Sequence, residues 1–146
     1  MKRGIIAAAA AAALAACAGV PSRVANGKVE NVIDQTAERG GAFEAIGIGA
    51  ADPALKTDTQ RKAVARDAAI VKAQYELLAM VEGVTLTGGV RVDQAMEKDS
   101  DLQTRVQAMI RGAEVVKSEF TADDGCVVTL RLPKSRLSVL TGTGVE

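Results

Sequence analysis

Residues 57–82 constrain the fold most, because their apolar spacing predicts one long helix. Thr57 and Gln60 fit a capping box at its start, and Gly83 follows as a stop signal. Two apolar sets lie on different sides of this helix: Val64, Ala68, Val71, Tyr75 and Leu78 on one, and Ile70, Ala73, Leu77 and Val81 on the other. We expect a sheet to cover one set, and a second helix of the domain or a second protomer to cover the other.

A strand is predicted at residues 42–50, where one face carries small side chains. The first face is lined by Phe43, Ala45, Gly47 and Gly49, and the second by Glu44, Ile46, Ile48 and Ala50. Since glycine presents no side chain, we expect another backbone to pack close to Gly47 and Gly49. The chain has only two phenylalanines and one tyrosine, so its core must rely on such close approach.

The other predicted elements alternate strands and helices. Residues 84–92 predict a half-buried strand with a bulge at Gly88-Gly89, and a capping box at Ser100 opens a helix that ends near Arg111. Residues 113–121 and 126–132 predict a hairpin around Asp124-Gly125. The fold class is therefore α+β: one long helix and a shorter helix packed on a small antiparallel sheet, in the order β-α-β-α-β-β.

The first 17 residues have the layout of a secretory signal. Lys2 and Arg3 precede the apolar residues 5–16, and this stretch is shorter than the ~20 residues of a membrane-spanning helix. The segment Leu14-Ala15-Ala16-Cys17 resembles the bacterial lipobox. The resemblance implies that Cys17 receives a diacylglyceryl group and becomes the new N-terminus. The alternative is ordinary cleavage within Ala16-Cys17-Ala18, which would release a soluble periplasmic protein.

This leader divides the chain into four predicted parts. They are a lipoprotein signal peptide (1–16), a lipidated N-terminus and tether (17–41), a single α+β domain (42–140) and a flexible tail (141–146). Val29, Val32 and Ile33 fall at helical spacing and predict a short helix near residues 28–38 of the tether. Another short helix is expected near the end of the domain, around 134–140.

The residue types leave little for catalysis. Histidine, the commonest general base and metal ligand, is absent from the sequence. Cys126 shares a predicted strand face with Val128, Leu130 and Leu132, so we interpret it as an inert buried thiol. The pair Asp123-Asp124 is explained as turn formers. We predict that the protein is not an enzyme and has no cofactor or metal.

Charged residues give no stronger indication of a ligand. Glu97, Asp99 and Asp101 could gather a calcium ion, but they lack the glycine and terminal glutamate of an EF-hand loop. We expect Glu44 and Glu119 to face solvent at a sheet edge. Basic and acidic residues balance at 18 each and no basic run is present, so no nucleic-acid partner is expected.

In chain order these elements resemble a bacterial lipoprotein family. The likeness rests on Ala45-Ile46-Gly47-Ile48-Gly49, on the helix with Ala63, Ala65, Ala69, Ala73 and Leu77-Leu78, on Ile110-Arg111-Gly112, and on Asp124-Gly125 before Val127-Val128-Thr129-Leu130. Across about residues 43–135 it looks like the Lpp-twenty-type outer-membrane lipoproteins, which are related to the N-terminal domain of flagellar assembly protein T. The resemblance implies one long helix on an antiparallel sheet and a role in the envelope, in some members beside flagellar or surface structures. Only Cys17 carries over as a functional position.

These observations favour a non-enzymatic, lipid-anchored interaction or assembly module. By the family rule for the residue after the cysteine, Ala18 points to the outer membrane, and we expect the domain to face the periplasm. Its expected partners are the membrane, through the acyl chains, and a second copy or an envelope protein, through helix 57–82. The alternative is a phospholipid- or glycan-binding module, because residues 82–90 (EGVTLTGGV) and 110–116 (IRGAEVV) resemble the BON module.

Overall fold

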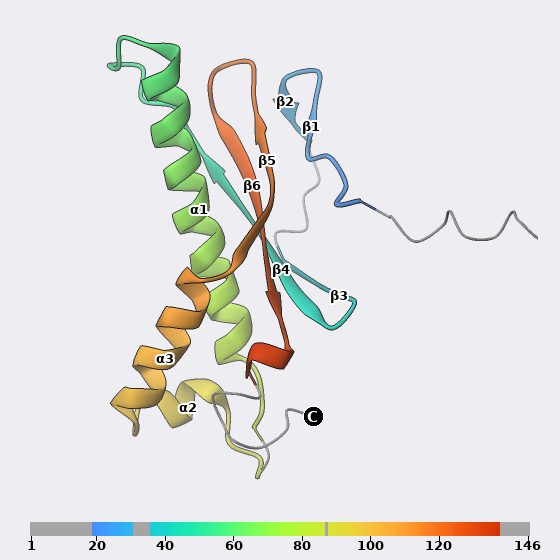
Figure 1. Ribbon diagram of the computed structural model, residues 1–146, viewed down its shortest axis with the longest axis vertical. Coiled ribbons are helices and arrows are strands. Elements are labelled where there is room, and N and C mark those ends of the chain that lie inside the picture. The colour runs from blue at the N-terminus through green and yellow to red at the C-terminus, as the bar shows by residue number, and fades with distance from the viewer. Residues whose placement is uncertain (1–18, 31–35, 87, 138–146) are drawn as a thin grey trace, which may run out of the picture.

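The computed structural model describes residues 19–30, 36–86 and 88–137 (Figure 1). In chain order its elements are β1 (Val24–Ala25), β2 (Lys28–Val29), β3 (Thr36–Arg39), β4 (Ala42–Gly49), α1 (Asp58–Glu82), α2 (Val92–Met96), α3 (Ser100–Arg111), β5 (Glu114–Phe120) and β6 (Cys126–Pro133). The leader, Cys17 and the predicted tail lie outside the described residues. The predicted α+β class is confirmed.

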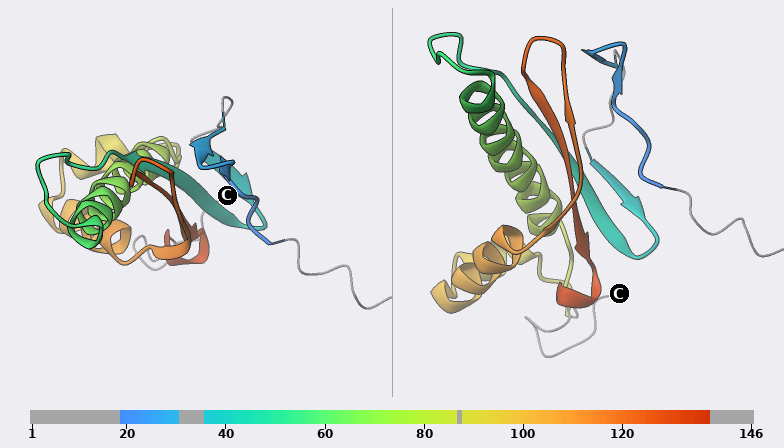
Figure 2. Two further views of the ribbon diagram at one scale, coloured as in Figure 1. Left: turned by 90° about the horizontal axis from the view of Figure 1, so that it is seen from above. Right: turned by 45° about the horizontal axis from the view of Figure 1, so that its top comes forward.

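A four-stranded antiparallel sheet and the helix α1 form the body of the molecule. The strand order is β3-β4-β6-β5, so β4 and β6 are internal and β3 and β5 are edges. Helix α1 contacts β4 and β6 along one face of the sheet, and α2 and α3 lie near its C-terminal end (Figure 1). Seen from above, β1 and β2 lie on the other side of the sheet from α1 (Figure 2).

Helix α1 forms as its sequence predicts. The Thr57 side chain accepts a hydrogen bond from the Gln60 backbone N–H at 3.2 Å, which caps the first turn. The helix ends at Gly83, whose N–H donates to the Ala79 carbonyl. The residues of α1 that pack into the core are small or aliphatic: Ala65, Ala69, Ala73, Leu77 and Val81. The sheet is thus the expected cover for one apolar surface of the helix.

The glycine face of β4 is where helix and sheet approach most closely. A Cβ atom added to Gly47 would lie 1.9 Å from the Ala69 carbonyl oxygen, and one added to Gly49 would lie 2.0 Å from that of Ala65. Alanines on the helix and glycines on the strand therefore bring the two backbones into direct contact. The expectation of a close backbone neighbour at Gly47 and Gly49 is confirmed.

The hairpin of β5 and β6 is confirmed as well. Its tip contains Asp124 in the left-handed region (φ 63°), and the Thr121 N–H donates to the Gly125 carbonyl at 2.9 Å. A second hairpin joins β3 to β4 through Gly40 and Gly41, both with positive φ, as a type I′ turn requires.

The predicted order of elements is wrong after α1, because residues 84–92 do not add a strand to the sheet. Within this segment the Leu86 N–H donates to the Val90 carbonyl at 2.8 Å, and the Val92 N–H donates to the Val84 carbonyl at 2.9 Å. Gly88 and Gly89 have positive φ and reverse the chain. The alternation that predicted one strand therefore belongs to two short arms that pair with each other.

The predicted helix near 28–38 is also wrong. Lys28 and Val29 form β2, residues 36–39 form β3, and residues 31–35, with Val32 and Ile33, lie outside the described part. The pairs Asn26-Gly27 and Gly40-Gly41 have positive φ and turn the chain into hairpins. Part of the predicted tether therefore supplies a strand of the sheet.

Smaller differences concern the second helical region. The cap of α3 is Asp99 rather than Ser100, because the Asp99 Oδ1 atom accepts from the backbone N–H groups of Asp101 and Leu102. The short helix α2 occupies part of a segment expected to be a loop. The helix expected around 134–140 is present as far as the structure describes it: residues 135–137 are helical, Leu137 is buried in the core, and residues 138–140 lie outside the described part.

Replacing Gly47 by alanine tests the close approach of β4 and α1. The new methyl group would collide with the backbone of α1, so we expect Gly47→Ala to lower the free energy of unfolding by about 3 kcal/mol. The matched control is Gly83→Ala, where φ is −74° and the nearest atom is 3.4 Å from the added Cβ. Urea unfolding measures both, and equal stabilities would contradict the packing described.

Candidate functional site

The segment that follows the predicted lipidation site is bound to the domain. Gly19 begins the described chain two residues after Cys17. Lys117 donates to the Val20 carbonyl at 3.0 Å, the Arg23 N–H donates to the Glu119 carboxylate at 2.8 Å, and the Ala122 N–H donates to the Gly27 carbonyl at 2.8 Å. This docked N-terminal segment, residues 19–30, therefore does not behave as a free tether.

The docked segment lies over the sheet face opposite α1. In β6, Val127 and Thr129 alternate with the core residues that face the helix, so they lie on the opposite face of the sheet. Glu119 and Lys117 of β5 are their register partners and lie on that same face. Glu119 was expected to face solvent at a sheet edge. It does lie on an edge strand, but its carboxylate accepts hydrogen bonds from the Ser22 hydroxyl and the Arg23 backbone.

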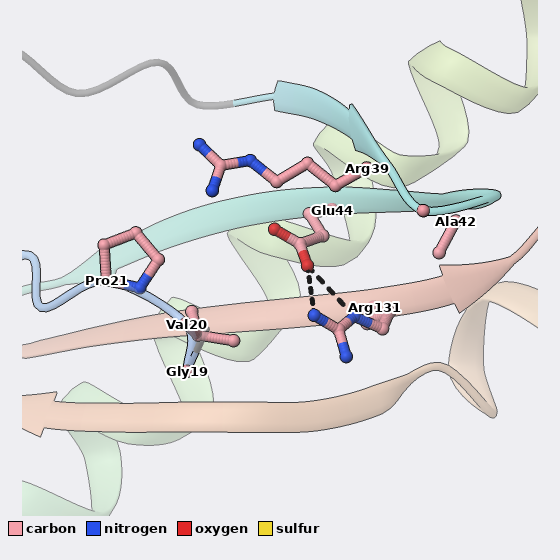
Figure 3. A pocket seen from close by; sticks show the side chains of 8 residues that line it. Gly19, Val20, Pro21, Arg39, Ala42, Glu44 and Arg131 are labelled. Carbon is pink, nitrogen blue, oxygen red and sulfur yellow. Dashed lines mark hydrogen bonds and ion pairs between the residues drawn. The ribbon is translucent and has the colours of Figure 1, made fainter. Parts of the chain in front are cut away.

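An ion pair between a buried carboxylate and a partly exposed arginine joins the two internal strands on the same face. Glu44 is 5% exposed, and its Oε1 atom accepts a hydrogen bond from Arg131 Nε at 2.9 Å (Figure 3). The two residues are register partners on β4 and β6. The expectation that Glu44 faces solvent at an edge is wrong, because β4 has a neighbour on both sides.

A cleft of about 410 Å³ separates the docked N-terminal segment from this pair. It is lined by Gly19, Val20, Pro21, Arg39, Gly40, Ala42, Glu44 and Arg131 (Figure 3). The cleft contains charges of both signs, but the Glu44 carboxylate and the Arg131 guanidinium already neutralise each other. We therefore interpret the pair as a structural link between strands.

The outer face of α1 carries an apolar stripe, which we define as Val64, Ala68, Val71 and Tyr75. Their side chains lie on one shallow surface with Asp67 and Lys72, facing away from the buried side of the helix. The exposed fractions are 46% for Val64, 64% for Val71 and 65% for Tyr75. Four of the five residues of the expected second apolar surface therefore lie together, uncovered by the described residues. The fifth, Leu78, is instead half-buried against the core.

Polar groups border this stripe on both sides. Lys72 forms an ion pair with Glu76 at 2.9 Å, and its Nζ atom lies 5.3 Å from the centre of the Tyr75 ring. Asp67 is exposed on the other border. A stripe of large apolar side chains with charged borders is typical of a helix that packs against another helix.

Cys126 is fully buried in the core beside Val128, Leu130 and Leu132, as its strand face predicts. Burial raises the pKa of its thiol. A raised pKa keeps the sulfur protonated, and the thiol form is a poor nucleophile.

The acidic pair of the hairpin tip has a structural role that sequence reasoning missed. Asp123 and Asp124 lie in the turn, as expected, and a hydrogen bond from Thr121 lowers the pKa of Asp123. Asp124 Oδ2 also accepts from Arg61 Nε at 2.9 Å, which fixes the hairpin tip to the start of α1. The sequence separation of 63 residues gives no local signal for this contact.

Across residues 19–30, 36–86 and 88–137, no three His, Cys, Asp or Glu side chains gather closely enough to hold a metal ion. Asp99, one of the three acids considered for calcium, instead caps α3. No helix in this same part of the chain has the length and apolar character needed to cross a membrane. Comparison with models of known families, with curated proteins and with solved structures finds no match.

A double-mutant cycle tests the Glu44–Arg131 pair. We expect Arg131→Met to lower the free energy of unfolding by about 2–3 kcal/mol, because it leaves a buried carboxylate without its partner. Adding Glu44→Leu should recover most of that loss, since two apolar residues need no compensation. Thermal and urea unfolding measure the cycle. Additive effects of the two substitutions would show that the pair is not coupled.

Thiol labelling tests the burial of Cys126. At pH 8.5 an ordinary cysteine is about half ionised, whereas the raised pKa and the packed surroundings should keep Cys126 unlabelled for hours. In urea the same thiol should react within minutes. Mass spectrometry counts the groups added to Cys17→Ser protein, in which Cys126 is the remaining cysteine. Rapid labelling of the folded protein would contradict an enclosed position.

Proposed function

We propose that this protein is a lipid-anchored, non-enzymatic envelope lipoprotein that offers the outer face of α1 to a protein partner. The exposed apolar stripe is the observation that carries the proposal. Val71 and Tyr75 add little to the packing of the domain, and clustered exposed apolar residues mark interaction sites.

The leader supports a lipid anchor. A basic start, an apolar stretch and Leu14-Ala15-Ala16-Cys17 together support diacylglyceryl transfer to Cys17. Two or three acyl chains hold a protein on a membrane durably, at about 0.8 kcal/mol for each buried CH₂. Ala18 and the resemblance to Lpp-twenty-type lipoproteins support an outer-membrane location, with the domain in the periplasm.

The position of the docked N-terminal segment supports membrane attachment on one side of the domain and partner binding on the other. It binds the sheet face opposite α1, so an acyl chain on Cys17 would leave the domain on that side. The apolar stripe lies on the far side of the sheet and stays free for a partner. The BON-like alternative gains less support, because residues 84–90, which carry its first signature, contribute no strand to the sheet.

Metabolic labelling tests the anchor. Full-length protein made in bacteria with a clickable palmitate analogue should carry the label, sediment with outer membranes and require detergent for release. Cys17→Ser should remove the label and the membrane association. An unlabelled wild-type protein with a soluble, processed N-terminus would overturn the lipid-anchored part of the proposal.

Crosslinking in intact membranes tests the interaction surface. Val71→Glu places a charge in the stripe, whereas the matched control Ala63→Glu adds the same charge at an exposed position of α1 outside it. We expect Val71→Glu to lose the crosslinked species that wild type and the control retain, with unchanged folding by circular dichroism. Equal crosslinking by both variants would argue against the stripe as the contact.

A further inference from the structure

We propose that the partner on the apolar stripe is a second copy of this chain, with the two α1 helices side by side and parallel. The inference rests on the proposed function, because it assigns an occupant to the surface described there. Two observations support it: the spacing of the apolar residues in the stripe, and the positions of two charged residues at its borders.

The stripe has the spacing of a helix-pairing seam. Val64, Ala68, Val71 and Tyr75 follow one another at intervals of four, three and four residues, the alternation of a coiled-coil core. The residues that face the sheet lie on the opposite side of α1 and are already buried. Two copies can therefore meet along this seam without disturbing the packing of either domain.

The border charges determine the direction of pairing. In a parallel pair the residue that borders the seam on one helix faces the residue five positions further along the other helix. Asp67 and Lys72 are five residues apart on opposite borders. Each Asp67 would therefore meet Lys72 of the second copy, and symmetry makes this contact twice.

An antiparallel pair lacks this match between opposite charges, because each border of the stripe would then face the same border of the second helix. The Asp67 border would meet another acidic border, and the Lys72 border another basic one. Lys72 keeps its contact with Glu76 in the parallel arrangement, since an ammonium group has three donors. The charges thus favour a parallel second copy.

The short length of the seam determines how strongly two copies should associate. Two heptads bury much less than the roughly 800 Å² per partner of a standard interface, so association should be weak in dilute solution. Confinement to one membrane raises the effective concentration and favours pairing. The docked N-terminal segment leaves the seam clear, because it lies on the other side of the sheet.

Disulfide trapping tests the parallel seam in membranes. In a parallel pair Val71 of one copy faces Val71 of the other, so full-length Val71→Cys should form a linked dimer in high yield under mild oxidation. Ala63→Cys, exposed on α1 outside the seam, should give at least fivefold less. A Val71→Cys yield equal to that of Ala63→Cys would overturn the inference.

Charge reversal tests the direction independently. We expect Asp67→Lys alone, or Lys72→Asp alone, to reduce linked Val71→Cys dimer roughly fivefold, because each creates two repulsive contacts. The double reversal should return the yield to within about twofold. Glu76→Gln removes only the in-helix partner of Lys72 and should have no effect. Failure of the double reversal to recover the dimer would contradict the proposed contact.

The outcomes separate this inference from the proposed function. A Val71→Cys adduct with a different envelope protein, and none with itself, would retain an interaction module but overturn the second copy. Wild-type protein linked through a free Cys17 would overturn the lipid anchor. The seam would then be judged by the same variants in a Cys17→Ser background.

Discussion

The fold depends on the direct contact between the backbones of α1 and β4. Gly47 and Gly49 leave no room for a side chain beneath Ala69 and Ala65, so the helix lies closer to the sheet than larger residues would allow. This closeness compensates for a chain with only three aromatic residues, because dispersion contacts between backbones replace those of bulky side chains. The other core residues pack around the short distance between α1 and β4.

Local patterns predicted the elements whose signals are local. The alternation of β4, the capping of α1 by Thr57 and the Asp124-Gly125 turn all specify structure within a few residues. The wrong predictions fall on segments that contain tight turns. Asn26-Gly27, Gly40-Gly41 and Gly88-Gly89 reverse the chain with positive φ, so two segments predicted as a helix and a sheet strand became hairpin arms.

Contacts between distant segments explain what could not be predicted around the candidate site. Glu44 is buried because β4 lies between two strands, where Arg131, 87 residues later, pairs with it. Glu119 is covered because the docked N-terminal segment binds it. A sequence shows that such side chains are charged, but only the tertiary arrangement shows which partner each one meets. The apolar stripe was predictable, because its spacing is a property of one helix.

The two sides of α1 are under different physical requirements. The inner side must stay small at Ala65, Ala69 and Ala73 for the helix to reach β4, and substitution there costs packing. The outer side is free of that requirement, and polar residues would serve an exposed helix at least as well. Val64, Val71 and Tyr75 are therefore the residues of α1 that the fold of one domain does not explain. The partner proposed above would explain their placement, with Asp67 and Lys72 on opposite borders.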